Sequence, residues 1–218
     1  METSTQRWRL RIDPSDAIIE FVSIVLAIVL ATAVNSWREG VQTRSDTRAM
    51  LLEIRQEITA NRDALQARYR HHLDVYTAMD AFAGRSAARH YASYDAMWQT
   101  FHRANPTGFS PFYGVQTSWD VAQSTGLLRN VDFATLKVLV GAYAMQTRAN
   151  GYLEHLINDL HMVPTGGDNV FYGLVTLNID LSDENSNERN LLEHYASALT
   201  ALDRAGIHDP RSARANSS

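Results

Sequence analysis

Five small or polar residues near the N-terminus share one face of an expected helix. Glu20, Ser23, Ala27, Ala31 and Asn35 follow one another at steps of three, four, four and four positions, the spacing of neighbours on one side of an α-helix. Small residues let two membrane helices approach closely, and polar side chains bond across such a contact. The pattern predicts a helix-association stripe, used for self-association or for docking onto another membrane subunit. The alternative is that Glu20 lies at the level of the lipid headgroups and the small residues stand there by chance.

This stripe needs a membrane helix to present it. Residues 17–34 form an apolar run broken by one glutamate, and Trp37 and Arg38 follow as anchors for the membrane interface. About 20 helical residues cross the ~30 Å hydrocarbon core of a bilayer. We therefore predict a short N-terminal tail over residues 1–16 and a transmembrane helix over residues 17–37, with the lipid bilayer as its partner.

A cleaved signal peptide contains a similar apolar run. Three arginines before the run and the Ala31-Thr32-Ala33 pattern favour cleavage. Three acidic residues directly before or inside the run oppose it, and so does the helical pattern that continues after Trp37. We interpret the run as an uncleaved anchor.

The orientation of the span depends on the basic residues near its two ends. Three arginines lie on each side of the span, so the arginine count alone gives no orientation. The compact basic cluster at residues 7–11 and the free amino terminus add positive charge on the N-terminal side and favour a cytoplasmic N-terminus. We expect a single-pass protein of the bacterial inner membrane, with a cytoplasmic N-terminus and a periplasmic C-terminal domain.

The composition excludes several classes of function. The chain has 218 residues, 20 basic and 24 acidic side chains and a formal charge of −4, so it offers no basic field for nucleic acid, which we exclude as a partner. It has no cysteine, which excludes disulfides, thiolate metal sites and cysteine nucleophiles.

A seam of residues at helical spacing, apolar except for one asparagine, continues past the expected membrane helix: Leu51, Ile54, Ile58, Asn61 and Leu65. Residues 43–83 contain neither proline nor glycine, so we predict one long stalk helix there that stops at Gly84. Asn61 within the seam fixes the register of a coiled coil in one interpretation. In the other, the seam packs inside a helical bundle formed by one chain.

The remaining sequence predicts an all-α fold, with an antiparallel helical bundle over residues 38–206 and a flexible tail over residues 207–218. Capping residues and helix breakers place the expected elements in order: a helix capped by Ser93, a helix over residues 113–125 ended by Gly126, a long helix from Asp132 to about Met162, a strand or helical turn over residues 171–177, a polar turn over residues 182–187 and a last helix over residues 188–205.

The polar residues that invite a metal or catalytic interpretation match no known motif. His155 and Asp159 lie four positions apart on one helix face, and three more polar residues lie on a neighbouring face: Glu154, Asn158 and His161. Ordinary surface pairs account for this spacing, and no serine has a nucleophile motif around it. We predict no enzyme activity, no metal and no cofactor. The aromatic residues between positions 91 and 119 either line a ligand pocket or pack short helices onto long ones.

Several motifs follow one another in a recognisable order. A glutamate near the start of the span precedes Asn-x-Trp at residues 35–37, a helical stretch at residues 51–61 and Ser124-Thr125-Gly126. This order resembles a family of uncharacterised single-span bacterial membrane proteins, over roughly residues 15–145. The family has no established activity, so the resemblance implies an architecture and no chemistry.

These observations favour a membrane-anchored helical interaction protein, a scaffold or accessory subunit of a larger envelope complex. The alternative is an extracytoplasmic ligand-sensing module that signals through a partner.

Overall fold

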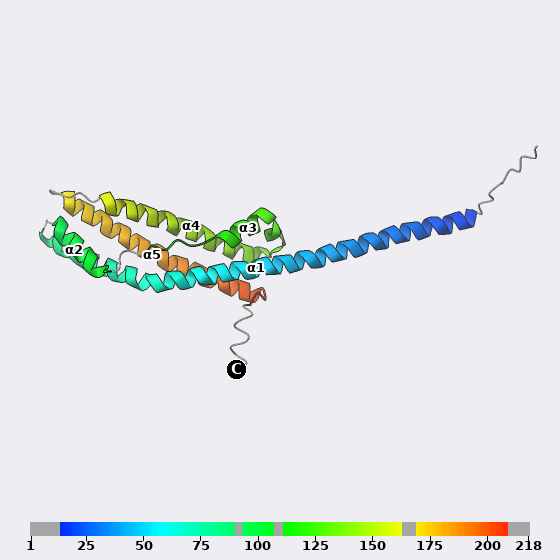
Figure 1. Cartoon of the computed structure of the whole chain (residues 1–218), viewed down its shortest axis with the longest axis horizontal. Helices are drawn as coiled ribbons and strands as arrows, with labels where there is room; N and C mark the ends of the chain where they lie inside the picture. The colour runs from blue at the N-terminus through cyan, green and yellow to red at the C-terminus, as the bar shows by residue number, and fades with distance from the viewer. Residues whose placement is uncertain (1–13, 90–92, 107–110, 163–168, 209–218) are drawn as a thin grey trace, which may run out of the picture. The chain divides into compact units, whose positions relative to one another are not determined.

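The structure is a computed structural model that describes residues 14–89, 93–106, 111–162 and 169–208, with side chains from residue 21 onward except at residues 89, 160–162 and 169. The described residues form helices and irregular links, with no strand among them. The prediction of an all-α protein is confirmed at this level (Figure 1).

The first helix, α1, covers Pro14–Arg89 without a break. The stop expected at Gly84 is therefore wrong, and the helix runs through this glycine for five more residues. Gly84 is exposed and has no positive φ, so nothing at this point turns the backbone out of the helix. The chain divides into two compact units, Met1–Asp46 and Thr47–Ser218, and α1 contributes residues to both.

The C-terminal unit contains the other helices, with these bounds: α2 Tyr94–Ala104, α3 Thr117–Thr125, the short 3₁₀ helix η1 Leu127–Asn130, α4 Phe133–Met162 and α5 Asn169–Arg204. The predicted caps are confirmed. The Ser93 hydroxyl accepts from the Ala96 amide, and the Asp132 carboxylate accepts from the Thr135 amide at 2.9 Å. Backbone hydrogen bonding to Asp132, chiefly from Thr135, lowers the pKa of this carboxyl.

The last helix decides one expectation and corrects another. Residues 171–177 are helical, which agrees with the helical alternative for this segment and not with the strand. Residues 182–187 are not a turn but the middle of α5. The helix ends where Gly206 adopts a φ of 75°, and the Ile207 amide then donates back to the Leu202 carbonyl. Ile207 is buried, so the first residue of the expected tail packs on the core; residues 209–218 lie outside the described part of the chain.

Two apolar clusters form the core of the C-terminal unit. The larger cluster joins α1, α3, α4 and α5, with Ile54, Ile58, Leu139, Leu191 and Leu202 fully buried. The second cluster joins a later part of α1 to α2, to the later part of α4 and to the first half of α5, through Val75, Met79, Met97, Leu156 and Leu174. Burying such side chains contributes about 1.5–3 kcal/mol each, so these clusters hold the helices of this unit together.

Replacing a glycine by alanine should have opposite effects inside a helix and at a helix end. A Cβ at Gly84 would meet nothing within 4 Å, so Gly84→Ala should raise the free energy of unfolding by about 0.5–1 kcal/mol. Gly126 has a φ of 69°, and Gly126→Ala should lower it by about 1–2 kcal/mol because an L-residue is strained there. Urea unfolding of the full chain measures both. Destabilisation by Gly84→Ala would contradict the continuous helix.

Candidate functional site: a buried polar layer

The middle of α5 buries polar side chains between the two apolar clusters. Glu184, Asn185, Asn187 and Glu188 are each less than a tenth exposed, at 4%, 8%, 7% and 2%. Positions 184 and 188 occupy core positions of the helix, because apolar residues continue at steps of three and four on both sides of them: Leu174, Leu177, Leu181, Leu191 and Tyr195. The sequence therefore places two glutamates where the fold requires inward-facing side chains.

Glu188 is paired with a histidine of α1. Its Oε1 atom lies 2.6 Å from Nδ1 of His72, and both side chains are 3% exposed. A carboxyl group buried without a partner is strongly disfavoured, so this short hydrogen bond allows Glu188 to occupy the core. It also joins α1 to α5 across 116 positions of sequence.

Glu184 is one helical turn away and has a different environment. Burial and the nearby charge of Glu188 raise the pKa of Glu184 to about 8 from its ordinary value of 4.5. At neutral pH this carboxyl group is therefore mostly protonated and neutral, which is the less unfavourable state for a group in low dielectric. The polar layer holds a proton at Glu184.

Several buried acceptor oxygens of α5 are left without a donor. Within the described part of the chain, five buried side-chain oxygens have no hydrogen-bond partner: Asn178 Oδ1, Asp180 Oδ2, Glu184 Oε2, Asn185 Oδ1 and Glu188 Oε2. Buried polar atoms in folded proteins are nearly always paired. All five atoms lie on α5, and a buried acceptor is unfavourable as long as it stays unpaired.

The layer extends toward α4 at Asp180. Burial and a hydrogen bond with Asp159 raise the pKa of Asp180. Asp159 in turn pairs with His155 at 3.4 Å, and the His155 side chain is 67% exposed. The helix-surface interpretation of the His155–Asp159 pair agrees with this geometry. Among the described residues, no group of three histidine, aspartate or glutamate side chains could hold a metal ion.

A second polar network lies inside the larger apolar cluster. The Asn61 amide donates to the Val115 carbonyl at 2.6 Å and to Gln146 Oε1 at 3.1 Å. The Tyr195 hydroxyl donates to the same Gln146 oxygen at 2.6 Å. Asn61 is thus satisfied within one chain, which favours packing inside a single chain over a coiled-coil register role. Nearby, Tyr143 donates to Glu57 Oε1 at 2.6 Å.

The residues of the predicted stripe lie in the N-terminal unit. Ser23, Ala27, Ala31 and Asn35 are exposed, and the Asn35 amide donates to Glu39 of the next turn at 2.6 Å. The side chain of Glu20 lies outside the described residues. Trp37 is 70% exposed, and Arg38 is also exposed.

The helix that carries the stripe is apolar and uncovered. Within the described residues, α1 contains one stretch long and apolar enough to cross a membrane by length and composition, and none of that stretch is buried. Phe21, Val22 and Leu30 are all more than half exposed. A signal sequence has a similar length and apolar composition. The core helix of a soluble domain has them too, but it would be mostly buried.

The aromatic side chains of the middle segment pack on one another where they are described. Trp119 stacks on Tyr143 with ring centroids 4.7 Å apart, and Trp98 meets Phe101 edge to face at 5.5 Å. Tyr91 and Phe109 lie outside the described residues. The contacts agree with the packing interpretation of these aromatics.

The functional signal that sequence reasoning missed was the polar run at residues 182–187. A cluster of serine, aspartate, asparagine and glutamate is typical of a turn, yet the three-four spacing of the flanking leucines continues through it. That spacing could have shown that Glu184 and Glu188 face inward.

Comparisons of the chain with protein-family models, with curated proteins and with solved structures find no match.

The raised pKa of Glu184 makes the stability of the protein depend on pH. Because the folded-state pKa of about 8 exceeds the ordinary 4.5, this group contributes stability that is present below pH 4.5 and is lost as the pH rises through 8. We expect Glu184→Gln to remove that loss. The difference in unfolding free energy between variant and wild type should shift in favour of the variant by a few kcal/mol, on the order of 1.4 kcal/mol per pH unit, between pH 5 and about 8.

Urea unfolding of the full chain across this pH range measures the difference. Glu193, exposed on the same helix, supplies the matched control, and Glu193→Gln should leave the pH dependence unchanged. If the unfolding free energies of Glu184→Gln and wild type change in parallel with pH, the pKa of Glu184 is not raised in the folded protein.

Proposed function

We propose that the protein is a membrane-anchored helical interaction protein, a scaffold or accessory subunit of a larger complex in the bacterial envelope. The proposal rests on one observation: the most apolar stretch of α1 is entirely exposed, while the C-terminal unit closes its own apolar cores. Large apolar surface is stable only when lipid or another protein covers it. A single membrane span over residues 17–37 would provide that cover.

In this proposal the remaining chain forms an antiparallel helical bundle on the periplasmic side, and α1 continues from the span as its first helix. The family of single-span bacterial membrane proteins that the sequence resembles has the same proposed architecture. The proposal assigns no reaction to the buried layer of polar residues in the C-terminal unit.

The contact surface within the membrane is the stripe of Glu20, Ser23, Ala27, Ala31 and Asn35. Alanine and serine side chains allow a second helix to approach closely. The opposite side of the same helix carries larger residues, among them Val22, Val25 and Val29, which suit lipid. This asymmetry favours a helix that binds another helix over one that serves only as an anchor.

A cysteine scan tests self-association directly, because the chain contains no cysteine of its own. Single cysteines at positions 22 to 35, oxidised in native membranes, should give disulfide-linked dimers with a helical period that peaks at positions 23, 27 and 31. Ala27→Leu with Ala31→Leu should reduce cross-linking of a cysteine at position 23 by about tenfold, since bulky side chains separate the backbones. The matched control, Val25→Leu with Val29→Leu, adds bulk to the other side and should change little.

If the partner is another subunit, purification in mild detergent should recover it with the wild type and lose it with the Ala27→Leu, Ala31→Leu variant. A protein that is monomeric, purifies alone and shows no periodic cross-linking would overturn the proposed function.

A further inference from the structure

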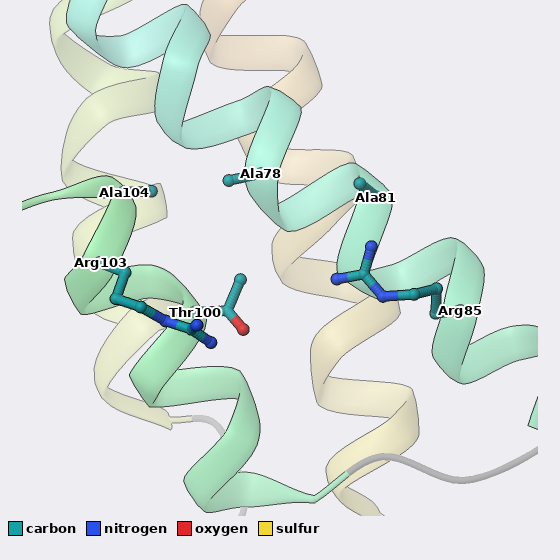
Figure 2. Close-up of a pocket in the computed structure, with 6 residues that line it drawn as sticks. All are labelled: Ala78, Ala81, Arg85, Thr100, Arg103 and Ala104. Carbon is teal, nitrogen blue, oxygen red and sulfur yellow. The ribbon is translucent and has the colours of Figure 1, made fainter.

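A groove between α1 and α2 carries two positive charges that no carboxylate of the described chain neutralises. Ala78, Ala81 and Arg85 line it from α1, and Thr100, Arg103 and Ala104 line it from α2. Its volume is about 390 Å³. Figure 2 shows the two guanidinium groups extending toward each other from opposite sides of the groove, with Thr100 between them.

The shape of the groove follows from its small residues. Alanine at positions 78, 81 and 104 leaves space where two packed helices would otherwise fill the gap with longer side chains. The α2 helix is held beside α1 by its own contacts, because Met97 and Phe101 are buried with Val75 and Met79. At the end of α2, Asn105 Oδ1 lies 2.8 Å from Nε2 of His71. The groove is therefore a fixed feature of this helix pair.

The charges of the groove stand out against a second groove of similar size. That groove, about 420 Å³ between α1 and α5, is also lined by two arginines, two threonines and an alanine. There, Arg55 pairs with Asp203 at 2.8 Å and Arg62 pairs with Asp63 at 2.8 Å. Within the described part of the chain, Arg85 and Arg103 have no such ion pair. The Arg103 Nε–H donates to the Gln99 carbonyl, within its own helix, at 3.1 Å.

The position of one of the two arginines has an explanation that requires no ligand. Arg103 lies in the last turn of α2, where a cation interacts favourably with the helix dipole. That effect gives no reason for Arg85 to extend toward the same groove. The Thr100 hydroxyl already donates to the Ala96 carbonyl at 2.8 Å, so it adds a methyl group and an acceptor oxygen to the groove, while the guanidinium groups provide the donors.

We propose that the α1–α2 groove binds a small organic anion, whose carboxylate or phosphate oxygens accept hydrogen bonds from Arg85 and Arg103 and whose short apolar body rests on the three alanines. Guanidinium groups present planar donor pairs that match carboxylate and phosphate oxygens. The alanines favour a compound with carbon atoms over a bare inorganic ion. This site is independent of the proposed contact in the membrane.

Calorimetric titration of the full chain in a non-ionic detergent tests the proposal at low ionic strength, where screening is weak. The probes are succinate and glycerol phosphate, with sodium chloride as the control for charge alone. We expect saturable binding of at least one organic anion with a Kd on the order of 1 mM. Arg85→Gln and Arg103→Gln should each weaken it at least about tenfold. Arg62→Gln, in the neutralised groove, should leave it unchanged.

A second variant tests the role of the alanines that line the groove without changing any charge. Ala81 is exposed, so Ala81→Leu should fold normally and fill the groove, and it should also weaken binding at least about tenfold. Circular dichroism of each variant confirms that the helices are intact. Absence of saturable binding in the wild type, or an equal loss in Arg62→Gln, would overturn the proposal, as would a wild-type affinity for the Ala81→Leu variant.

Discussion

The hydrogen bond between His72 and Glu188 is the interaction on which the C-terminal unit depends most. It joins α1 to α5 in a region where both side chains are withdrawn from water, and its loss would leave a buried charge or an unpaired ring nitrogen. The neighbouring Glu184 meets the same problem in another way, by retaining its proton. Both solutions are required because the helical spacing of α5 directs these positions inward, whatever residues occupy them.

Local rules predicted the starts of α2 and α4 and the end of α3 correctly, but not the end of α1 or the middle of α5. Ser93 and Asp132 are capping residues whose side chains each accept a hydrogen bond from the amide three positions later, and such bonds depend only on nearby sequence. The run of polar residues at 182–187 has the composition of a turn, yet inward-facing positions continue through it at helical spacing. Glu188, directly after the run, pairs with His72 of α1, more than a hundred positions away. Composition describes a segment; burial depends on what packs against it.

The candidate sites show the same limit. The spacing of Glu20 through Asn35 defines a helix face from sequence alone, because one helix suffices to create it. The groove between α1 and α2 could not be predicted in this way, since it needs Arg85 and Arg103 from different helices and small residues between them. The sequence also left the role of single polar residues open. Asn61 was compatible with a coiled coil or with a packed core, and its hydrogen bonds to Val115 and Gln146 of the same chain favour the packed core.

The position of the polar layer between the two apolar clusters has a consequence for cooperativity. Side chains on either side of Glu184 and Glu188 pack in separate groups, so we expect apolar contacts to couple the folding of the two groups weakly. The half that contains α2 and Leu174 is expected to open as a subglobal unit, while the half around Leu191 and Leu202 exchanges its amide hydrogens only through global unfolding. The polar layer of α5 would then mark the boundary between two folding units of one domain.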